Sequence, residues 1–187
     1  MAPSTAIVWF RRDLRVHDLP ALAAAAAGHD RVVPLFVVDE ARVGGRFASP
    51  NRTWFMLESV RLLGGELEAL GAPLVVRTGD PRALVPALAL ELGGADVYTS
   101  RDHAPYGRTR DRAVGEALAA SGSTLHPQRG VLVHEPDELA TAAGAPFSLY
   151  SPFRRAWEIR ARRSPLGPPT GLGRHGVDPG RLPTLDT

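Results

Sequence analysis

Residues 5–18, TAIVWFRRDLRVHD, decide the fold, because an apolar strand runs directly into a cluster of charge. Residues 5–10 are apolar without alternation, which is typical of a strand that is covered on both faces. Three arginines and two aspartates follow within residues 11–18. A chain that only leaves a buried strand does not need so much charge, so this cluster is a candidate for part of a binding site.

Apolar runs and helical segments alternate along the rest of the chain. The predicted strands are residues 5–10, 31–39, 73–80, 95–100 and 123–128, and the predicted helices are residues 19–28, 50–71, 81–94 and 107–122. Alternating strands and helices are typical of a parallel sheet. We therefore predict a doubly wound α/β domain over residues 1–135, with a five-stranded, Rossmann-like parallel sheet of order 3-2-1-4-5 and helices on both faces.

Local signals mark the helices of this domain. Asp18 is the predicted N-cap of the first helix, and Gly28 its stop signal. The long helix at residues 50–71 carries apolar side chains at spacings of three and four, which predicts a buried stripe made of Trp54, Leu57, Val60, Leu63, Leu67 and Leu70. Residues 131–136, VLVHEP, are predicted to be a short extended piece.

The chain changes character after the sheet. Residues 136–163 form a connecting segment with a predicted basic helix at residues 150–163, YSPFRRAWEIRARR. Residues 164–187 are rich in Pro and Gly and read as a linker between domains, which predicts that a partner domain lies outside this chain. The GLGRHG match to G-x-G-x-x-G at residues 171–176 carries no weight, because a strand must precede that motif and a helix must follow it.

Composition excludes several classes of function. The chain has no cysteine, which excludes disulfides and thiolate metal sites and favours a reducing, cytoplasmic compartment. The N-terminus does not resemble a signal peptide, and no apolar run approaches the roughly 20 residues that cross a bilayer. All 22 basic residues are arginine, but the net charge is only +2, so the chain is not a polycation. A GC-rich genome explains the arginine bias better than a functional demand does.

Several familiar motifs are absent from the sequence. No Walker A motif occurs, and the first strand-to-helix turn carries FRRDLRVHD where a dinucleotide-binding domain would carry glycines. The six histidines show no metal-binding spacing, so we predict no metal site and assign the histidines solvated or capping roles. No nucleophile constellation predicts a hydrolase.

The predicted topology brings two charged clusters together. Ligands of open α/β sheets bind beyond the carboxyl ends of the strands, at the point where the strand order reverses. For the order 3-2-1-4-5 this point lies between the first and fourth strands, which end at FRRDLR and at residues 100–111, SRDHAPYGRTRD. The alternative is that the clusters only lock loops through salt bridges of Arg11, Arg12 and Arg15 with Asp13, Asp18 and Asp102. We weigh ligand contact and loop locking evenly for each of these residues.

Seven segments in order resemble the DNA photolyase and cryptochrome family. They are WFRRDLRVHDLPAL, PLFVVDE, NRTWFMLESVRLL, LGAPLVVRTGDP, YTSRDHAPYGRTRDRAV, VLVHEP and SPFRRAW, and together they cover residues 5 to about 160. The chain resembles the N-terminal α/β domain of a class I (deoxyribodipyrimidine) photolyase. The resemblance implies a light-harvesting domain with an antenna chromophore, and a downstream helical domain that binds FAD and damaged DNA. That domain, which this chain lacks, repairs cyclobutane pyrimidine dimers with light energy.

The resemblance also bears on the antenna. Folate-binding relatives carry an Asn-Glu pair where this sequence has Tyr106 and Gly107, which counts against folate. Relatives that bind 8-hydroxy-5-deazaflavin carry E-P-Y-G-R after an Asp, and here Asp102 and P-Y-G-R match while Ala104 replaces the Glu. The resemblance thus implies deazaflavin contacts by Arg12, Phe36, Arg52 and Asp102, with Arg11 and Tyr106 as further candidates. It implies no catalytic residue within this chain.

Three alternatives stay open at the level of sequence. A cryptochrome photoreceptor would use the same domain for signalling. A nucleotide-binding domain of the universal-stress or electron-transfer-flavoprotein type is remote, because no Gly-rich phosphate loop occurs late in the predicted sheet. The basic helix at residues 150–163 could contact DNA, but packing against a neighbouring domain through Phe153 and Trp157 is favoured. We expect a monomer with no membrane partner.

Overall fold

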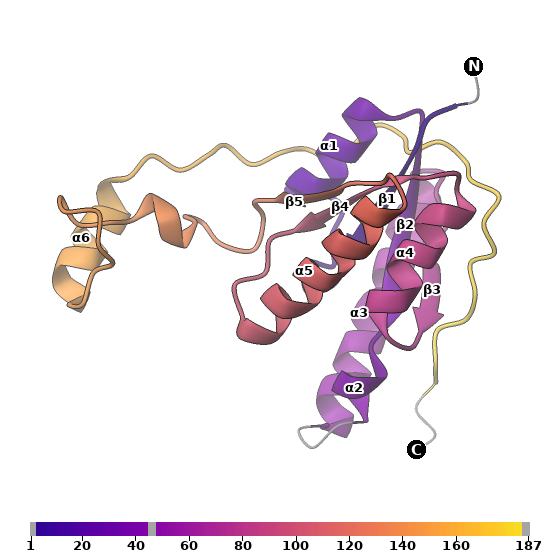
Figure 1. The fold of residues 1–187 in the computed structure, drawn as a ribbon, viewed down its shortest axis with the longest axis horizontal. Helices are drawn as coiled ribbons and strands as arrows, with labels where there is room; N and C mark the ends of the chain where they lie inside the picture. The colour runs from indigo at the N-terminus through magenta and orange to yellow at the C-terminus, as the bar shows by residue number, and fades with distance from the viewer. Residues whose placement is uncertain (1–2, 45–47, 185–187) are drawn as a thin grey trace.

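A computed structural model describes residues 3–44 and 48–184 as a parallel sheet between two helical layers (Figure 1). The strands are β1 (Thr5–Phe10), β2 (Arg31–Val38), β3 (Val75–Thr78), β4 (Asp96–Ser100) and β5 (Leu125–Gln128). The helices are α1 (Pro20–Gly28), α2 (Glu40–Val43), α3 (Pro50–Ala69), α4 (Pro81–Glu91), α5 (Pro105–Ala120) and α6 (Tyr150–Ile159), with a 3-10 helix, η1, at Pro136–Glu138. All strand pairs are parallel, and the order β3-β2-β1-β4-β5 confirms the predicted topology.

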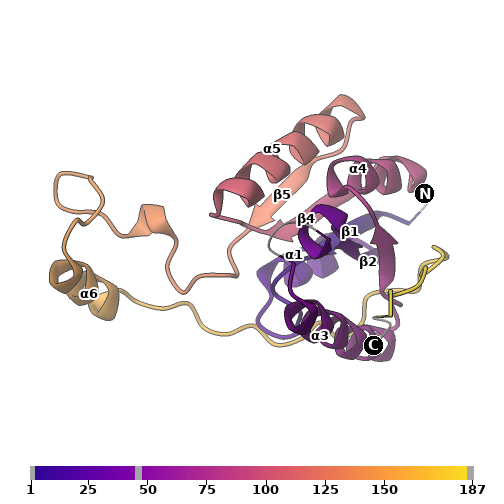
Figure 2. The ribbon, with the colours of Figure 1, turned by 90° about the horizontal axis from the view of Figure 1, so that it is seen from below.

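Each face of the sheet buries its own apolar core. Alternate side chains of a strand point to opposite faces, so Val8 and Phe10 of β1 pack with α1 and α3, while Ile7 and Trp9 pack with α4 and α5. The views of Figure 1 and Figure 2 show these two helix pairs on opposite sides of the sheet. Because helices cover both faces of the sheet, the side chains on both faces of these strands are apolar.

The ends of several elements differ from the predictions. Asp18 is not the N-cap of α1, because Leu19 takes that position with no side-chain hydrogen bond, although the helix does end at Gly28. The Asp18 carboxylate instead accepts hydrogen bonds from the Arg163 guanidinium and from the Leu166 N–H. The extended piece predicted at residues 131–136 forms no strand, and α2 was not predicted.

Helix α3 buries a narrower stripe than the spacing predicts. Leu57, Val60, Leu63 and Leu67 are buried, which confirms the centre of the predicted stripe. Trp54, however, is 59% exposed. Figure 1 shows that the end of α3 near α2, where Trp54 lies, extends beyond the strands of the sheet.

Residues 164–184, which we call the strap, hold no helix or strand but are bonded to the α/β domain. Figure 2 shows the chain running from α6 past α1 and α3 toward its C-terminus. Leu172 is 2% exposed and belongs to the core on the α1 and α3 face. Its carbonyl accepts from the Val32 N–H at 2.8 Å, and its own N–H donates to the Leu70 carbonyl at 3.1 Å. The last three residues of the predicted linker, 185–187, lie outside the described residues.

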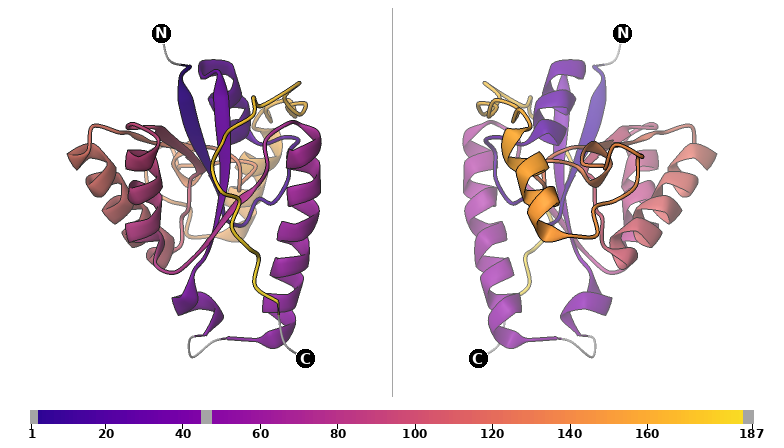
Figure 3. Two further views of the ribbon diagram at one scale, coloured as in Figure 1. Left: turned by 90° about the vertical axis from the view of Figure 1, so that its right-hand side faces the viewer. Right: turned by 90° about the vertical axis from the view of Figure 1, so that its left-hand side faces the viewer.

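The strap also covers the free edge of the sheet at β3 (Figure 3, left). The Val76 N–H donates to the Pro179 carbonyl at 2.7 Å. A Cβ atom on Gly180, whose φ is +68°, would lie 2.4 Å from the Val76 carbonyl oxygen. An uncovered edge strand is a template for pairing with other chains. Composition alone identifies this segment as a linker. The close approach of Gly180 to β3, however, explains why a glycine stands at this position.

In the part of the chain that the structure describes, no helix has the length and apolar character needed to cross a membrane.

The strap predicts a measurable contribution to stability. Replacing the buried Leu172 by Ala removes core contacts and leaves a cavity, so we expect L172A to lower the free energy of unfolding by about 2–4 kcal/mol. Leu166 is 40% exposed, so L166A is a matched control that should cost much less. Urea denaturation followed by circular dichroism measures both. Equal effects of the two variants would contradict the packing of the strap.

Candidate functional site

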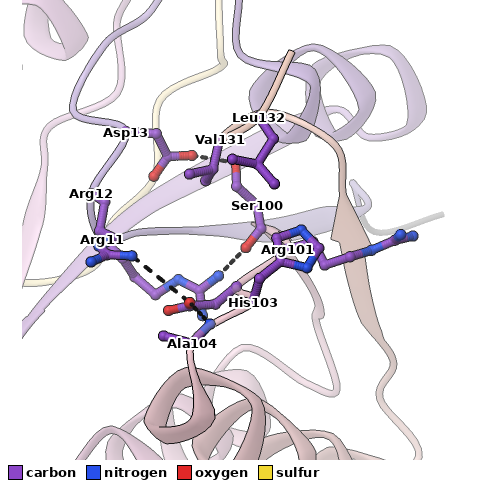
Figure 4. A pocket seen from close by; sticks show the side chains of 10 residues that line it. Arg11, Arg12, Asp13, Ser100, Arg101, His103, Ala104, Val131 and Leu132 are labelled. Carbon is purple, nitrogen blue, oxygen red and sulfur yellow. Dashed lines mark hydrogen bonds and ion pairs between the residues drawn. The ribbon is translucent and has the colours of Figure 1, made fainter. Parts of the chain in front are cut away.

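A hollow of about 260 Å³ lies beyond the carboxyl ends of β1, β2 and β4, where the topology predicts a ligand. We call it the central hollow. A second, small hollow of about 90 Å³ adjoins it and shares Arg11, Arg12, Asp102 and Ala104 with it. Figure 4 shows the side chains that line the small hollow. The shared residues make the two hollows neighbouring compartments of one crevice.

Apolar side chains line the central hollow from both faces of the sheet, because Phe36 belongs to the core on the α1 and α3 face and Trp9 to the core on the α4 and α5 face. Trp9 and Phe36, at the ends of β1 and β2, are 2% and 3% exposed and both line it. The guanidinium groups of Arg11 and Arg110 lie 4.8 Å and 4.9 Å from the centroid of the Trp9 ring. Cations over an aromatic face are attracted by its quadrupole. The Trp9 ring thus stabilises the two cations beside the hollow.

Arg11 is committed to the scaffold around the crevice. Its guanidinium pairs with Asp111 at 2.5 Å and donates a second hydrogen bond to the Ser100 carbonyl. Burial lowers the pKa of Arg11, and the nearby Asp111 carboxylate opposes that shift. Predicted salt bridges of Arg11 to Asp13, Asp18 or Asp102 are wrong, because Asp111 of α5 takes this role. Arg11 thus ties β1 to β4 and α5 from beneath the hollows.

Arg12 and Asp102 face each other at the boundary of the two hollows. Their closest nitrogen and oxygen are 3.9 Å apart, and the Arg12 side chain is 66% exposed. The predicted pairing of these two residues is therefore present, but it is loose. Arg12 has enough freedom to turn toward a ligand at little cost in free energy.

Asp102 is held much more firmly than Arg12. One carboxylate oxygen accepts from the Ala104 N–H at 3.0 Å, and the other lies 3.4 Å from the Arg110 guanidinium. Burial alone would raise the pKa of Asp102, but the Ala104 hydrogen bond and the charges of Arg11, Arg110 and Arg12 outweigh it and lower the pKa. Asp102 therefore presents a fixed, charged acceptor at the mouth of the crevice.

Tyr106 and Asp39 bridge the central hollow on its outer side. Tyr106, in the first turn of α5, is 42% exposed, and its hydroxyl donates a hydrogen bond to the Asp39 carboxylate after β2. Burial raises the pKa of Tyr106, and the hydrogen bond to Asp39 raises it further. The Arg42 guanidinium lies 5.0 Å from the centroid of the Tyr106 ring. Tyr106 is thus a neutral donor that spans the opening.

Arg52, another predicted site residue, does not line the central hollow itself. It lies in the first turn of α3 and lines an adjoining hollow of about 250 Å³. The two hollows share Arg42, Val43 and Met56, so the prediction for Arg52 stays a prediction. Arg12, Phe36, Asp102, Arg11 and Tyr106 do meet around the central hollow, as predicted.

The central hollow has four further polar or aromatic lining residues that were not predicted as site residues: Trp9, Asp39, Arg42 and Arg110. Two of them follow the ends of strands, where a ligand is expected: Trp9 lies at the end of β1 and Asp39 directly after β2. The third, Arg110, lies in α5 and belongs to the charged residues 100–111. Arg42 lies in α2, which no sequence signal predicts.

The remaining polar residues of the opening stretch fix its loop. Asp13, 7% exposed, accepts a hydrogen bond from the Ser100 hydroxyl. Arg15 donates to the carbonyls of His17, Asp18 and Gly130 rather than to a carboxylate, which corrects the predicted salt bridges. These bonds hold the β1–α1 loop against β4 and the segment after β5.

Histidines do not gather into a metal site. His103 lies 2.8 Å from Glu135, and His126 lies 3.0 Å from Asp96. His134 and His175 are buried, at 6% and 9% exposure, which corrects the expectation of solvated or capping roles for these two residues. Among residues 3–44 and 48–184, no three metal-ligating side chains come together.

Comparisons with known proteins show the family of this chain. The family model described as DNA photolyase matches residues 6–170. A deoxyribodipyrimidine photo-lyase from Synechococcus sp. is 34% identical over 89% of this chain and 34% of the relative. A cryptochrome DASH from Gloeobacter violaceus is 35% identical over 99% of this chain and 38% of the relative.

A solved structure shows the same fold. The crystal structure of a class III photolyase from Agrobacterium tumefaciens has a TM-score of 0.85 and 33% identity, and the match covers 97% of this chain and 38% of that one. The chain therefore spans a little more than a third of the length of these relatives.

The firmly held Asp102 predicts a pH-dependent contribution to stability. Because its pKa is lowered in the folded state, its ionised form stabilises the fold above its unfolded pKa of about 3.9, and that stabilisation is lost as the pH falls through the folded pKa. We expect D102N to be less stable than the wild type by about 1 kcal/mol at pH 7, with the difference shrinking below about pH 4.

Urea denaturation between pH 7 and pH 3 measures this difference. The side chain of Asp137 is 75% exposed, so D137N is the matched control and should differ little from the wild type at any pH. If D102N were less stable than the wild type by the same free energy at every pH in this range, that result would contradict a stabilising charge on Asp102.

Proposed function

This chain belongs to the DNA photolyase family, and from that premise we propose that it is a light-harvesting domain that binds an antenna chromophore. The observation that carries the proposal is the crevice at the carboxyl ends of β1 and β4. It combines aromatic side chains, Trp9 and Phe36, with a firmly held carboxylate, Asp102, and an exposed arginine, Arg12. A planar chromophore needs apolar surface and a few polar groups at its edge.

We propose 8-hydroxy-5-deazaflavin as the chromophore. Phe36 and Trp9 offer the apolar surface for a tricyclic ring, and Asp102 accepts a hydrogen bond from a ring N–H. Arg12 pairs with a ring oxygen or stacks on the ring, because a guanidinium suits both geometries. Position 107, where the folate-binding pattern has an acidic residue, is Gly107 here, so the anchor for folate is missing.

The catalytic step belongs to a part of the protein that these residues do not supply. In this proposal the antenna passes its excitation energy to FAD in a helical domain, and that domain splits cyclobutane pyrimidine dimers in damaged DNA. The 187-residue chain alone binds chromophore and repairs no DNA. The family relatives are more than twice as long as the region they share with this chain, which supports this division of labour.

The surface of helix α6 is better suited to packing against that second domain than to binding DNA. Three of the five arginines at residues 150–163 pair within the chain: Arg154 with Glu158, Arg160 with Glu138 and Arg163 with Asp18. Figure 3, right, shows α6 standing in front of the α/β layers. Tyr150 and Ile159 are 73% and 85% exposed, so apolar surface is offered for packing.

A cryptochrome photoreceptor is the second candidate. The cryptochrome DASH relative matches as much of this chain as the photolyases do, and both functions would use the same antenna crevice. A DNA-repair assay on a protein that contains both this chain and an FAD-binding domain separates the two candidates.

The antenna proposal predicts selective binding of deazaflavin. The purified chain is mixed with equal amounts of 8-hydroxy-5-deazaflavin and a reduced folate, and then passed through a desalting column. We expect the retained chromophore to be the deazaflavin, with an absorption band in the near-ultraviolet or blue. Preferential retention of folate would contradict the choice of chromophore.

Asp102 predicts the response of that complex to substitution. D102N keeps the size of the side chain but removes the charged acceptor, so we expect its deazaflavin affinity to fall by about 10- to 100-fold, which is the range for a hydrogen bond to a charged group. D137N is the matched control and should bind like the wild type. Fluorescence titration measures both, and an unchanged affinity of D102N would remove Asp102 from the site.

A further inference from the structure

Gly107 lies against the carboxylate of Asp102 more closely than any other residue type would allow. A Cβ atom at position 107 would be 2.2 Å from both Cγ and Oδ2 of Asp102, and 2.7 Å from its Cβ. Real Cβ atoms do not come within 3.0 Å of such neighbours. Asp102 has only one carbon between its backbone and its carboxylate, so it cannot bend out of the way and keep its position.

Neither the backbone nor the helix explains this glycine. Gly107 is not among the residues with positive φ, where glycine is favoured. It lies within α5 (Pro105–Ala120), where glycine is one of the least favourable residues. The space that glycine leaves is therefore what distinguishes this position, and Asp102 fills that space.

The position of Asp102 depends on this space. Its carboxylate folds back onto the first turn of α5, accepts from the Ala104 N–H at 3.0 Å and lies 3.4 Å from the Arg110 guanidinium. A methyl group at position 107 would force the carboxylate to leave both partners. The acceptor would then leave the boundary between the central and small hollows, both of which Asp102 lines.

We propose that Gly107 is a positioning residue of the antenna site. By carrying no side chain, it holds the Asp102 carboxylate where it accepts a hydrogen bond from a ring N–H of a flavin-type chromophore. The chromophore class it selects is a planar ring with an unsubstituted N–H at the edge that faces Asp102. This inference rests on the proposed antenna function and adds to it a residue that lines the central hollow and acts through the position of Asp102.

The same helix offers a matched control. Gly115 also lies in α5, but a Cβ atom there would be 3.7 Å from the Leu125 Cδ2 atom, which is ordinary van der Waals contact. G107A and G115A thus make the same chemical change in the same helix. Only G107A displaces Asp102.

The test uses 8-hydroxy-5-deazaflavin and its analogue methylated at the ring nitrogen N3. Fluorescence titration gives the affinity of each for the wild type, G107A, G115A, D102A and the double variant G107A/D102A. We expect the wild type and G115A to prefer the parent compound by about 10- to 100-fold, because methylation removes the hydrogen bond to a charged acceptor. G107A and D102A should bind both compounds about equally, and the double variant should bind no more weakly than D102A.

Circular dichroism shows whether each variant folds. A preference for the parent compound that survives in G107A, or a further loss of affinity in the double variant, would overturn the assignment of Gly107 and leave the antenna function standing. Failure of the wild type to bind either compound would overturn the proposal that deazaflavin is the antenna chromophore, and the assignment of Gly107 would fall with it.

Discussion

The pairing of β1 with β4 is the constraint on which the rest of the crevice depends. Val8 stands beside Tyr98 in the parallel register, so the two strands end together. The Thr99 hydroxyl donates to the Trp9 carbonyl at 3.0 Å, just before both strands give way to loops. Because β1 and β4 are neighbours in space but distant in sequence, this pairing alone brings Arg11 and Arg12 to Asp102.

The charge in the opening stretch divides between scaffold and site. Buried Arg11 and Asp13 bond to α5 and β4, and Arg15 bonds to backbone carbonyls. Removing Arg11 or Asp111 would leave the other charge uncompensated in a buried place, which is strongly destabilising. Arg12 is mostly exposed, and the Asp102 carboxylate that it pairs with is 3.9 Å away. Exposure thus separates the arginine that is available to a ligand from those that hold the loop.

The layered fold follows from the sequence because burial on two faces leaves strong periodic signals. The predicted sheet order is confirmed, and it determines where the charged clusters meet. Partners across space leave no such signal: nothing near Arg11 in the sequence points to Asp111. Gly180 shows a further limit, because composition identifies its surroundings as a linker, whereas contact with β3 requires a glycine there. Arg52 is a candidate by resemblance alone, and it lines a hollow that adjoins the central one through Arg42, Val43 and Met56.

The central claim is that the crevice between the ends of β1 and β4 holds the chromophore. A crystal structure of this chain grown with 8-hydroxy-5-deazaflavin tests it most directly. The account predicts density for a planar ring against Phe36 and Trp9, with a ring nitrogen within hydrogen-bond distance of the Asp102 carboxylate. Density for the ring at any other place, with the crevice unchanged, would contradict it.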